Sequence, residues 1–338
     1  MRRLWAAVLL FSLFASAWAL SAPAKVIRVG YFPNITHAQA LVGMATGAFQ
    51  RRLGPNVVIK TFLFNAGPSA MEALMAGELD LTYVGPNPAI TCYIRTDGEA
   101  LRIVAGAASG GAGLVVRKDV KIGGPADLAG KSLATPQLGN TQDVALRHYL
   151  GAHNLKPLEF GGSVRVLPTA NPDQLTLLLK KEIDGAWTVE PWVSRLIKEA
   201  GGRLLLDERS LWPRGMFVTG HLVARRKFLQ SQPQLVKAWL QAHVEVTRAI
   251  NADPAWARRV LNGEIQRYTG KALPEDVLRD AWGRLSITYD PVSASLHKSA
   301  QWAYELGFLG QTRPNLRNIY DLNLVNQVLR EKNLPAVK

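Results

Sequence analysis

The chain alternates short apolar runs with amphipathic segments from Val26 to about residue 225. Short apolar runs bounded by Gly or Pro are typical of buried strands, and the amphipathic segments have helical spacing. This alternation predicts an α/β fold with parallel strands and crossover helices. Predicted strands lie in the runs beginning at 26 and 57 and at 79–84, 101–105, 131–135 and 164–167. From 233 to the end the pattern is mostly helical.

Two predicted strands lead directly into segments that have the pattern of a helix start. Thr36-His37-Ala38-Gln39 and Ser69-Ala70-Met71-Glu72 both have a Ser or Thr followed three residues later by Gln or Glu, which is the capping-box pattern. Gly139-Asn140-Thr141 forms a third turn before a predicted helix. A helix start offers free backbone N–H groups and a positive dipole end, so these three turns predict an anion site.

The sequence also contains two pairs of similar segments, which suggest an internal repeat. Residues 78–86 and 182–191 both have Glu-apolar-Asp before a strand with an aromatic residue, and then a proline. Residues 113–118 resemble 221–226. We therefore expect two similar α/β lobes joined by two crossover strands. Lobe one comprises 26–113 plus 220–338 and lobe two comprises 114–219, with a ligand cleft between them where the strands end.

The first 19 residues have the pattern of a secretory signal peptide. Arg2 and Arg3 precede an apolar run, 4–14, and a small-residue stretch, 15–19, that ends as A-x-A. The alternative is a retained membrane anchor, because 4–20 almost reaches the length of a spanning helix. We expect cleavage after Ala19, export to the periplasm and a soluble mature protein.

Charge favours small anions over nucleic acid as partners. The formal net charge is +14, but the basic residues are scattered in separate pairs and triplets rather than in one stripe. Cys92 is the only cysteine, so the fold has no internal disulfide, and we expect this thiol to be buried and inert.

Candidate ligand contacts begin at the first two predicted helix starts. Asn34, Thr36 and His37 follow the first strand, and Gly67 with Ser69 follows the second. Thr36 either caps its own helix or touches the ligand. His37, at a helix N-terminus, is expected to stay neutral and donate a hydrogen bond.

Further candidates follow later strands and are listed here: Gly85, Pro86, Asn87, Ser109, Gly139, Asn140 and Thr141. The 85–88 segment is either a stiff rim of the cleft or a purely structural turn. The 109–111 segment either lines the cleft or belongs to the hinge side. The 139–141 turn is expected to bring donors from the second lobe.

Glu190 differs from the other candidates because a carboxylate repels an anion. It can pair an ammonium group, with Trp187 and Trp192 forming an apolar or cation-binding wall around it. The alternatives are that Glu190 caps the helix beginning at Pro191 and that either tryptophan belongs to the core.

Catalytic and metal-binding motifs are missing. The sequence has no G-x-S-x-G, no H-E-x-x-H and no phosphate-loop motif, and its six histidines form no metal pair at the usual spacing. We therefore expect a binding protein rather than an enzyme, without a metal or cofactor.

Several segments resemble the periplasmic binding proteins of nitrate/sulfonate/taurine-type ABC importers, and the aliphatic-sulfonate branch most of all. The segments are 29–38, 65–69, 77–80, 83–89 and 190–192. The resemblance implies a type II periplasmic binding fold that closes on a small anionic solute and delivers it to a membrane permease and its ATPase. It also implies anion binding at residues 34, 36, 67, 69 and 139–141, and an acidic residue near Glu190 that meets a ligand amine.

The sequence thus predicts a monomeric solute-binding protein for an aliphatic sulfonate or taurine-like anion, with no nucleic-acid partner. The alternatives are nitrate, a thiamine-precursor-like heterocycle, or an enzyme on the same fold that resembles pyrimidine-precursor synthases. The 33–37 segment differs from the shorter first loops of sulfonate binders, which leaves the solute open.

Overall fold

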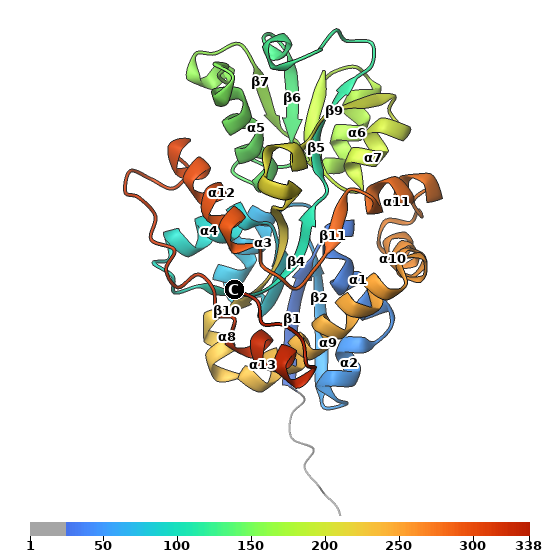
Figure 1. Ribbon diagram of the computed structural model, residues 1–338, viewed down its shortest axis with the longest axis vertical. Helices are drawn as coiled ribbons and strands as arrows, with labels where there is room; N and C mark the ends of the chain where they lie inside the picture. Colours follow the sequence, from blue (N-terminus) through green and yellow to red (C-terminus); the bar gives the residue numbers. More distant parts are fainter. Residues whose placement is uncertain (1–24) are drawn as a thin grey trace, which may run out of the picture.

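The computed structural model describes residues 25–338, so the predicted signal peptide lies outside the described residues. Two β-sheets form the centres of two lobes, one above the other in Figure 1. The lower sheet has six strands in the order β11-β4-β10-β3-β1-β2, and the upper sheet has five in the order β7-β6-β8-β5-β9. The six-stranded sheet with its helices is called the first lobe, and the five-stranded sheet with its helices is called the second lobe.

The first lobe contains both ends of the described chain. Its elements are β1 (Lys25–Tyr31), α1 (Ala38–Ala45), α2 (Ala48–Leu53), β2 (Val57–Leu63), α3 (Gly67–Met75), β3 (Leu81–Val84), α4 (Pro86–Arg95), β4 (Leu101–Gly110), β10 (Val218–Arg225), α8 (Arg226–Ser231), α9 (Pro233–Ala252), α10 (Pro254–Thr269), α11 (Glu275–Trp282), β11 (Leu285–Ile287), α12 (Ser293–Glu305) and α13 (Asn323–Glu331). A short 3-10 turn, Ile35–His37, precedes α1.

The second lobe is built from one continuous stretch of chain. Its elements are β5 (Ala112–Arg117), β6 (Ser132–Thr135), α5 (Thr141–Ala152), β7 (Arg165–Pro168), α6 (Asn171–Leu179), β8 (Gly185–Val189), α7 (Trp192–Lys198) and β9 (Gly202–Asp207). The chain enters this lobe from β4 into β5 and leaves it from β9 into β10. We propose that the lobe boundaries fall in these two crossings.

Both sheets are mixed rather than wholly parallel. β1 runs parallel to β2 and β3, and β6 runs parallel to β7 and β8. β10 is antiparallel to β3 and β4, and β5 is antiparallel to β8 and β9. The strands that follow each crossing therefore run against their neighbours, because the chain enters each sheet from the end that faces the other lobe.

Helices cover both faces of each sheet and bury separate cores. In the first lobe, α1 and α9 pack on one face, where Phe49 stacks on Trp239 at 3.8 Å between ring centroids. α3, α4 and α12 pack on the other face. Burying aromatic side chains of this size removes a large apolar area from water, which stabilises the lobe without a disulfide.

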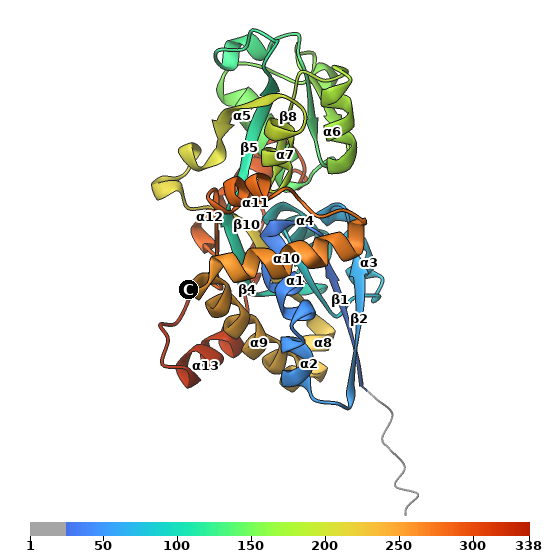
Figure 2. The ribbon, with the colours of Figure 1, turned by 90° about the vertical axis from the view of Figure 1, so that its right-hand side faces the viewer.

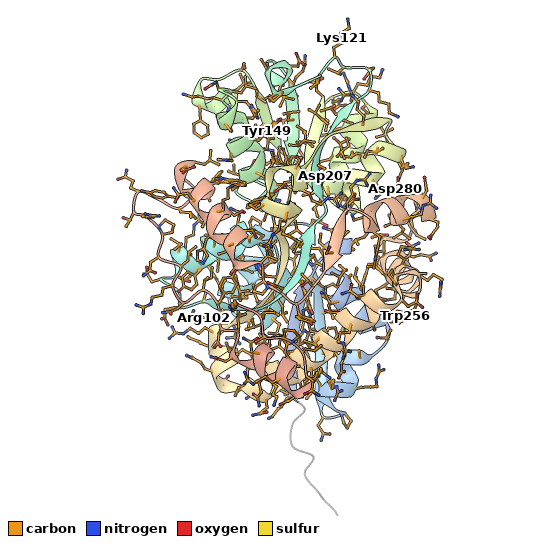
Figure 3. All side chains as sticks on the ribbon, in the orientation of Figure 1. Arg102, Lys121, Tyr149, Asp207, Trp256 and Asp280 are labelled. Atoms are coloured by element: carbon orange, nitrogen blue, oxygen red, sulfur yellow. The ribbon has the colours of Figure 1, made fainter. Side chains whose placement is uncertain are left out.

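The two lobes touch on both sides of the cleft. The Lys198 ammonium on α7 lies 3.1 Å from the Asp280 carboxylate on α11. Figure 3 labels Asp280 at the level where the lobes meet. Figure 2 shows α11 between α7 above and α10 below. Near α12, His148 of the second lobe stacks on Trp302 at 4.1 Å. The structure therefore has its cleft largely closed.

Candidate functional site

A cavity lies between the lobes where the parallel strands of both sheets end, and we call it the inter-lobe cavity. The space it encloses is about 30 Å³. A single buried water needs about 10–15 Å³, so the cavity accommodates only a group of a few atoms. Its lining residues are Phe32, Asn34, Thr36, His37, Asn65, Ala66, Gly67, Gly85, Pro88, Pro136, Asn140, Thr141, Gln142, Asn171, Val189 and Thr219.

Helices of the first lobe start at this cavity without side-chain caps. Ala66 is the N-cap of α3 and Gly85 is the N-cap of α4, and neither has a side chain that caps its helix. Pro68, Pro86 and Pro88 carry no N–H, so the other residues of these first turns are the donors. The Ile35–His37 turn adds a third start before α1. Uncapped N–H groups that face a shared space attract negative charge.

Two helices of the second lobe start on the opposite wall. The Oδ1 of Asn140 accepts a hydrogen bond of 2.9 Å from the Asp143 N–H and so caps α5. α6 starts at Asn171, whose Oδ1 accepts from the Thr188 hydroxyl at 2.9 Å. Five helix starts from both lobes thus converge on one small cavity.

Thr141, the first residue of α5, has an unsatisfied hydroxyl at this wall. The residue is 7% exposed, and its Oγ1 makes no hydrogen bond within the described part of the chain. A Cβ built on Gly85 would lie 2.5 Å from this Oγ1, so the hydroxyl points across the cleft at the backbone of the first lobe. A buried hydroxyl without a partner is costly, and a ligand oxygen would satisfy it.

His37 is a neutral donor at the same cavity. The Phe32 N–H donates to His37 Nδ1 over 3.1 Å, which places the ring proton on Nε2. Burial lowers the pKa of His37 to about 3, so the ring stays uncharged at neutral pH. The neutral state was predicted from the sequence, but its cause is desolvation rather than the helix dipole.

No Lys, Arg, Asp or Glu belongs to the lining of the inter-lobe cavity within residues 25–338. The positive potential there comes from helix ends and from amide and hydroxyl donors. The net charge of +14 lies elsewhere on the chain, so it acts as a general attraction for anions rather than as direct contacts.

Seven residues predicted from the sequence lie together in this cavity: Asn34, Thr36, His37, Gly67, Gly85, Asn140 and Thr141. The predicted capping boxes are absent, however. α3 begins two residues before Ser69, and neither Thr36 nor Ser69 caps a helix with its side chain. Ser69 is exposed and outside the lining, because the helix starts at Gly67 and turns the serine outward.

The structure places four other predicted residues outside the cavity. Pro86 and Asn87 belong to the first turn of α4, a helix where the sequence suggested a rim or turn. Ser109 lies in β4, where its Oγ accepts from the Phe217 N–H at 3.3 Å, on the hinge side. Gly139 lies behind Asn140, and its N–H donates to the Asp143 carboxylate at 2.9 Å.

Glu190 is not among the residues that line the inter-lobe cavity. It is fully buried, and its carboxylate accepts hydrogen bonds from the Ser194 N–H and hydroxyl and pairs with Arg284 at 3.0 Å. Burial raises the pKa of Glu190 to about 7 in spite of these partners. Arg284 belongs to the first lobe, so the Glu190 carboxylate forms a contact between the two lobes. Trp187 is also buried in the core, where its Nε1–H donates to Glu208 at 2.8 Å.

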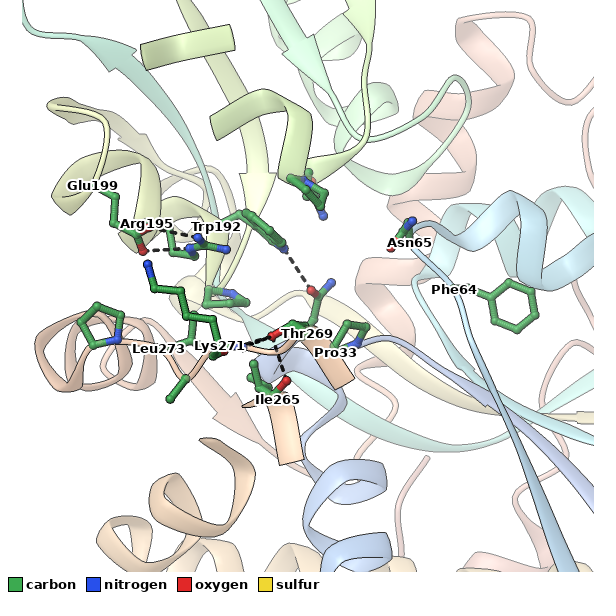
Figure 4. Close-up of a pocket in the computed structure, with 16 residues that line it drawn as sticks. Pro33, Phe64, Asn65, Trp192, Arg195, Glu199, Ile265, Thr269, Lys271 and Leu273 are labelled. Carbon is green, nitrogen blue, oxygen red and sulfur yellow. Dashed lines mark hydrogen bonds and ion pairs between the residues drawn. The ribbon is translucent and has the colours of Figure 1, made fainter. Parts of the chain in front are cut away.

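Trp192 lines a second, larger cavity of about 410 Å³, shown in Figure 4, which we call the tryptophan cavity. Its indole Nε1–H donates to Asn34 Oδ1 over 3.1 Å, which joins the second lobe to the first. Three asparagines line both cavities: Asn34, Asn65 and Asn171.

Sequence reasoning missed Asn65, Gln142, Asn171 and Thr219 as lining residues. A signal existed for Asn171, because Asn171-Pro172 opens a helix directly after a strand, as the segments at 34 and 140 do. Thr219 lies in β10 after a crossing, and only the three-dimensional path of the chain brings it to the cavity.

Within residues 25–338, three or more His, Cys, Asp or Glu side chains nowhere gather in a way that would hold a metal ion. None of the helices in this part of the chain combines the length and the apolar character needed to span a membrane.

Comparisons with known proteins agree with this architecture. The NMT1-like family model matches residues 21–262. The taurine-binding periplasmic protein of Escherichia coli is 25% identical over 310 residues, covering 88% of this chain and 92% of that protein. Among solved structures, the alkanesulfonate-binding protein SsuA of Xanthomonas axonopodis pv. citri bound to MOPS superposes with a TM-score of 0.71 at 20% identity, over 86% of this chain and 96% of SsuA.

The periplasmic nitrate-binding protein NrtA of Synechocystis PCC 6803 gives a TM-score of 0.77 at 16% identity, over 92% of this chain and 90% of NrtA. These likenesses confirm the two-lobed α/β fold, the type II periplasmic binding fold, that was predicted from the sequence.

Proposed function

Because the chain belongs to the NMT1-like family, we propose that it is the solute-binding component of an ABC importer and captures a small organic oxyanion between its two lobes. The preferred solute is an aliphatic sulfonate or a taurine-like compound. The protein then works as a monomer in the periplasm and delivers the solute to a membrane permease and its ATPase. The family also agrees with the resemblance identified in the sequence.

One observation carries this proposal: five helix starts from both lobes surround a cavity whose lining has no charged side chain. A sulfonate keeps its negative charge at every physiological pH, and N–H and O–H donors are enough to hold it. Charge-assisted hydrogen bonds contribute about 1.5–3 kcal/mol each, so a few of them support micromolar binding. Relatives named for taurine, alkanesulfonate and nitrate binding add support.

The mechanism follows from the two-sided cavity. In an open form, donors at Thr36 and Gly67 on one wall and at Thr141 on the other are separated. An anion that binds one wall lowers the free energy of the form in which the second wall also reaches it, so the ligand stabilises closure. Closure without a ligand leaves the Thr141 hydroxyl without a partner among the described residues, a cost that a ligand oxygen would remove.

Isothermal titration with methanesulfonate, ethanesulfonate, taurine, nitrate and acetate tests the proposal, after native mass spectrometry has shown that the purified protein carries no retained solute. We expect micromolar binding of at least one sulfonate. Thr141→Val removes a hydroxyl that bonds to no described residue, so it should leave folding intact and weaken binding by about tenfold. If no sulfonate, taurine included, gives a heat of binding, the proposal is overturned.

A further inference from the structure

The tryptophan cavity adjoins the inter-lobe cavity, because Asn34, Asn65 and Asn171 line both. Its volume, about 410 Å³, lies within the range of about 300–1,000 Å³ that is usual for small-molecule sites. Apolar side chains form much of its wall: Phe64, Pro172, Pro191, Trp192, Ile265 and Leu273. A group that continues from a bound oxyanion past the asparagines therefore enters a mainly apolar space.

The indole of Trp192 is held in a fixed position at this cavity. Its edge donates to Asn34, and the Arg195 guanidinium stacks over its ring at 4.6 Å from the centroid (Figure 4). Arg195 is itself held by two hydrogen bonds to Glu199, of 2.8 and 3.0 Å. An aromatic ring fixed in advance binds another ring at a low entropic cost.

Charges at the cavity disfavour an ammonium group. Glu199, the carboxylate in the lining, is already neutralised by Arg195, and the remaining charged residue of the lining is Lys271, which is exposed at the cavity. Glu190, the carboxylate next in the chain to Pro191, is buried against Arg284. An amine in this cavity would meet a cation and no free carboxylate within the described residues.

We propose that the two cavities bind one ligand, an oxyanion in the inter-lobe cavity that carries an apolar and preferably aromatic tail in the tryptophan cavity. This inference rests on the proposed function and narrows its substrate class from taurine-like to apolar sulfonates. Trp192 contacts the tail, and Arg195 and Glu199 are positioning residues that keep the indole in place.

The test is titration calorimetry in a chloride buffer with methanesulfonate, butanesulfonate, benzenesulfonate, naphthalene-2-sulfonate and taurine. Each buried methylene is expected to tighten binding by about fourfold. The two aromatic sulfonates should bind at least tenfold more tightly than methanesulfonate, and taurine more weakly than butanesulfonate.

Variants separate the tail from the oxyanion. Ala272→Trp fills the tryptophan cavity from its partly exposed wall and should abolish the gain of the aromatic sulfonates while methanesulfonate binding stays unchanged. Trp192→Ala should lower the affinity for naphthalene-2-sulfonate at least tenfold more than the affinity for methanesulfonate, and Trp192→Phe should recover much of this additional loss. Leu179→Ala, at an exposed residue outside both cavities, is the control and should change nothing.

The outcomes distinguish the two proposals. Equal affinity for methanesulfonate and the aromatic sulfonates, or tighter binding of taurine than of butanesulfonate, overturns the apolar-tail proposal and leaves the sulfonate-binding function standing. If no sulfonate binds at all, the proposed function fails and this inference fails with it.

Discussion

The indole N–H of Trp192 donates to the side-chain oxygen of Asn34 over 3.1 Å, and this bond joins the two lobes at the edge of the inter-lobe cavity. Asn34 follows the first strand of one lobe, and Trp192 opens α7 of the other. Because Asn34 lines both cavities, the bond lies between the predicted oxyanion site and the tail site. Closure of the lobes and the shape of the site are therefore coupled at one contact.

Trp192→Phe should weaken binding of a tail-less ligand by loosening the closed form. The substitution keeps an aromatic ring but leaves Asn34 Oδ1 without this donor, a loss worth about 1 kcal/mol, or about fivefold in affinity. Methanesulfonate titration checks this, with X-ray scattering of the ligand-bound protein as a measure of lobe separation. An unchanged affinity and radius of gyration would show that the bond plays no part in closure.

Gly85→Ala should block closure more severely. The φ of Gly85 is −68°, so alanine fits the backbone, but its Cβ would lie 2.5 Å from the Thr141 hydroxyl of the opposite lobe. Overpacking of this kind costs about 1–3 kcal/mol, and here it falls on the closed state. We expect affinity to drop about 10- to 100-fold with little change in thermal stability.

Gly124→Ala is the matched control for that experiment. A Cβ at Gly124 meets no atom within 4 Å, and its φ is −158°, which any residue adopts. This variant should bind sulfonate as the parent protein does. Equal binding by both alanine variants would contradict a closed state in which Thr141 approaches Gly85.

The internal repeat in the sequence, residues 78–86 with 182–191 and 113–118 with 221–226, has a structural counterpart. In the first lobe, the Arg28 N–H donates to Asp80 at 3.0 Å, and Arg225 of the strand after the crossing pairs with the same carboxylate at 2.7 Å. The Glu-apolar-Asp pattern is local, because the aspartate directly precedes its strand, but the partners of Asp80 lie 52 and 145 residues away in the sequence.

The second lobe repeats the arrangement. The Ser132 N–H donates to Asp184 at 2.8 Å, and Arg117 lies 3.4 Å from that carboxylate. The repeated pattern around each aspartate consists of neighbouring residues, which is why the strands and the two-lobed class could be predicted. The partners of Asp184 lie 52 and 67 residues away in the sequence, and the pattern did not contain them.

Side-chain roles at the site depended on the tertiary structure and were predicted less well. The capping interpretation of Ser69 was wrong because the helix starts earlier, at Gly67, which offers its N–H without a cap. The carboxylate of Glu190 could bind an amine, but in the structure it pairs with Arg284, which is 94 residues away in the sequence. No local pattern contains a partner that distant.

Glu190→Gln should therefore change stability rather than ligand choice. The carboxylate contacts Ser194 and Arg284 and belongs to neither cavity lining, so the ratio of taurine to ethanesulfonate affinity should stay within about twofold of the parent ratio. Thermal unfolding should shift, because Arg284 loses its charged partner. A selective loss of taurine binding would restore the amine-contact hypothesis for Glu190.

Glu208 predicts how stability depends on pH. Its carboxylate is buried in the second lobe, where it accepts hydrogen bonds from the Nε1–H groups of Trp187 and Trp212 at 2.8 and 3.3 Å. Burial raises the pKa of Glu208 to about 7 from a usual value of 4.5. Between these values the folded state keeps a proton that the unfolded state has released.

The free energy of unfolding should then fall as pH rises through this window. The slope is about 1.4 kcal/mol per pH unit, so the group contributes about 3 kcal/mol of stability below its unfolded pKa that is lost once the pH passes about 7. Burial also raises the pKa of Glu190 to about 7, so Glu190 acts in the same direction.

Urea unfolding between about pH 5 and about pH 7 measures the slope of the free energy of unfolding against pH. Glu208→Gln should reduce this slope by the contribution of one titrating group. The variant should also be less stable at every pH, because the amide NH₂ of the glutamine faces a tryptophan N–H donor. A variant with the parent slope would mean that Glu208 is ionised in the folded protein throughout this range.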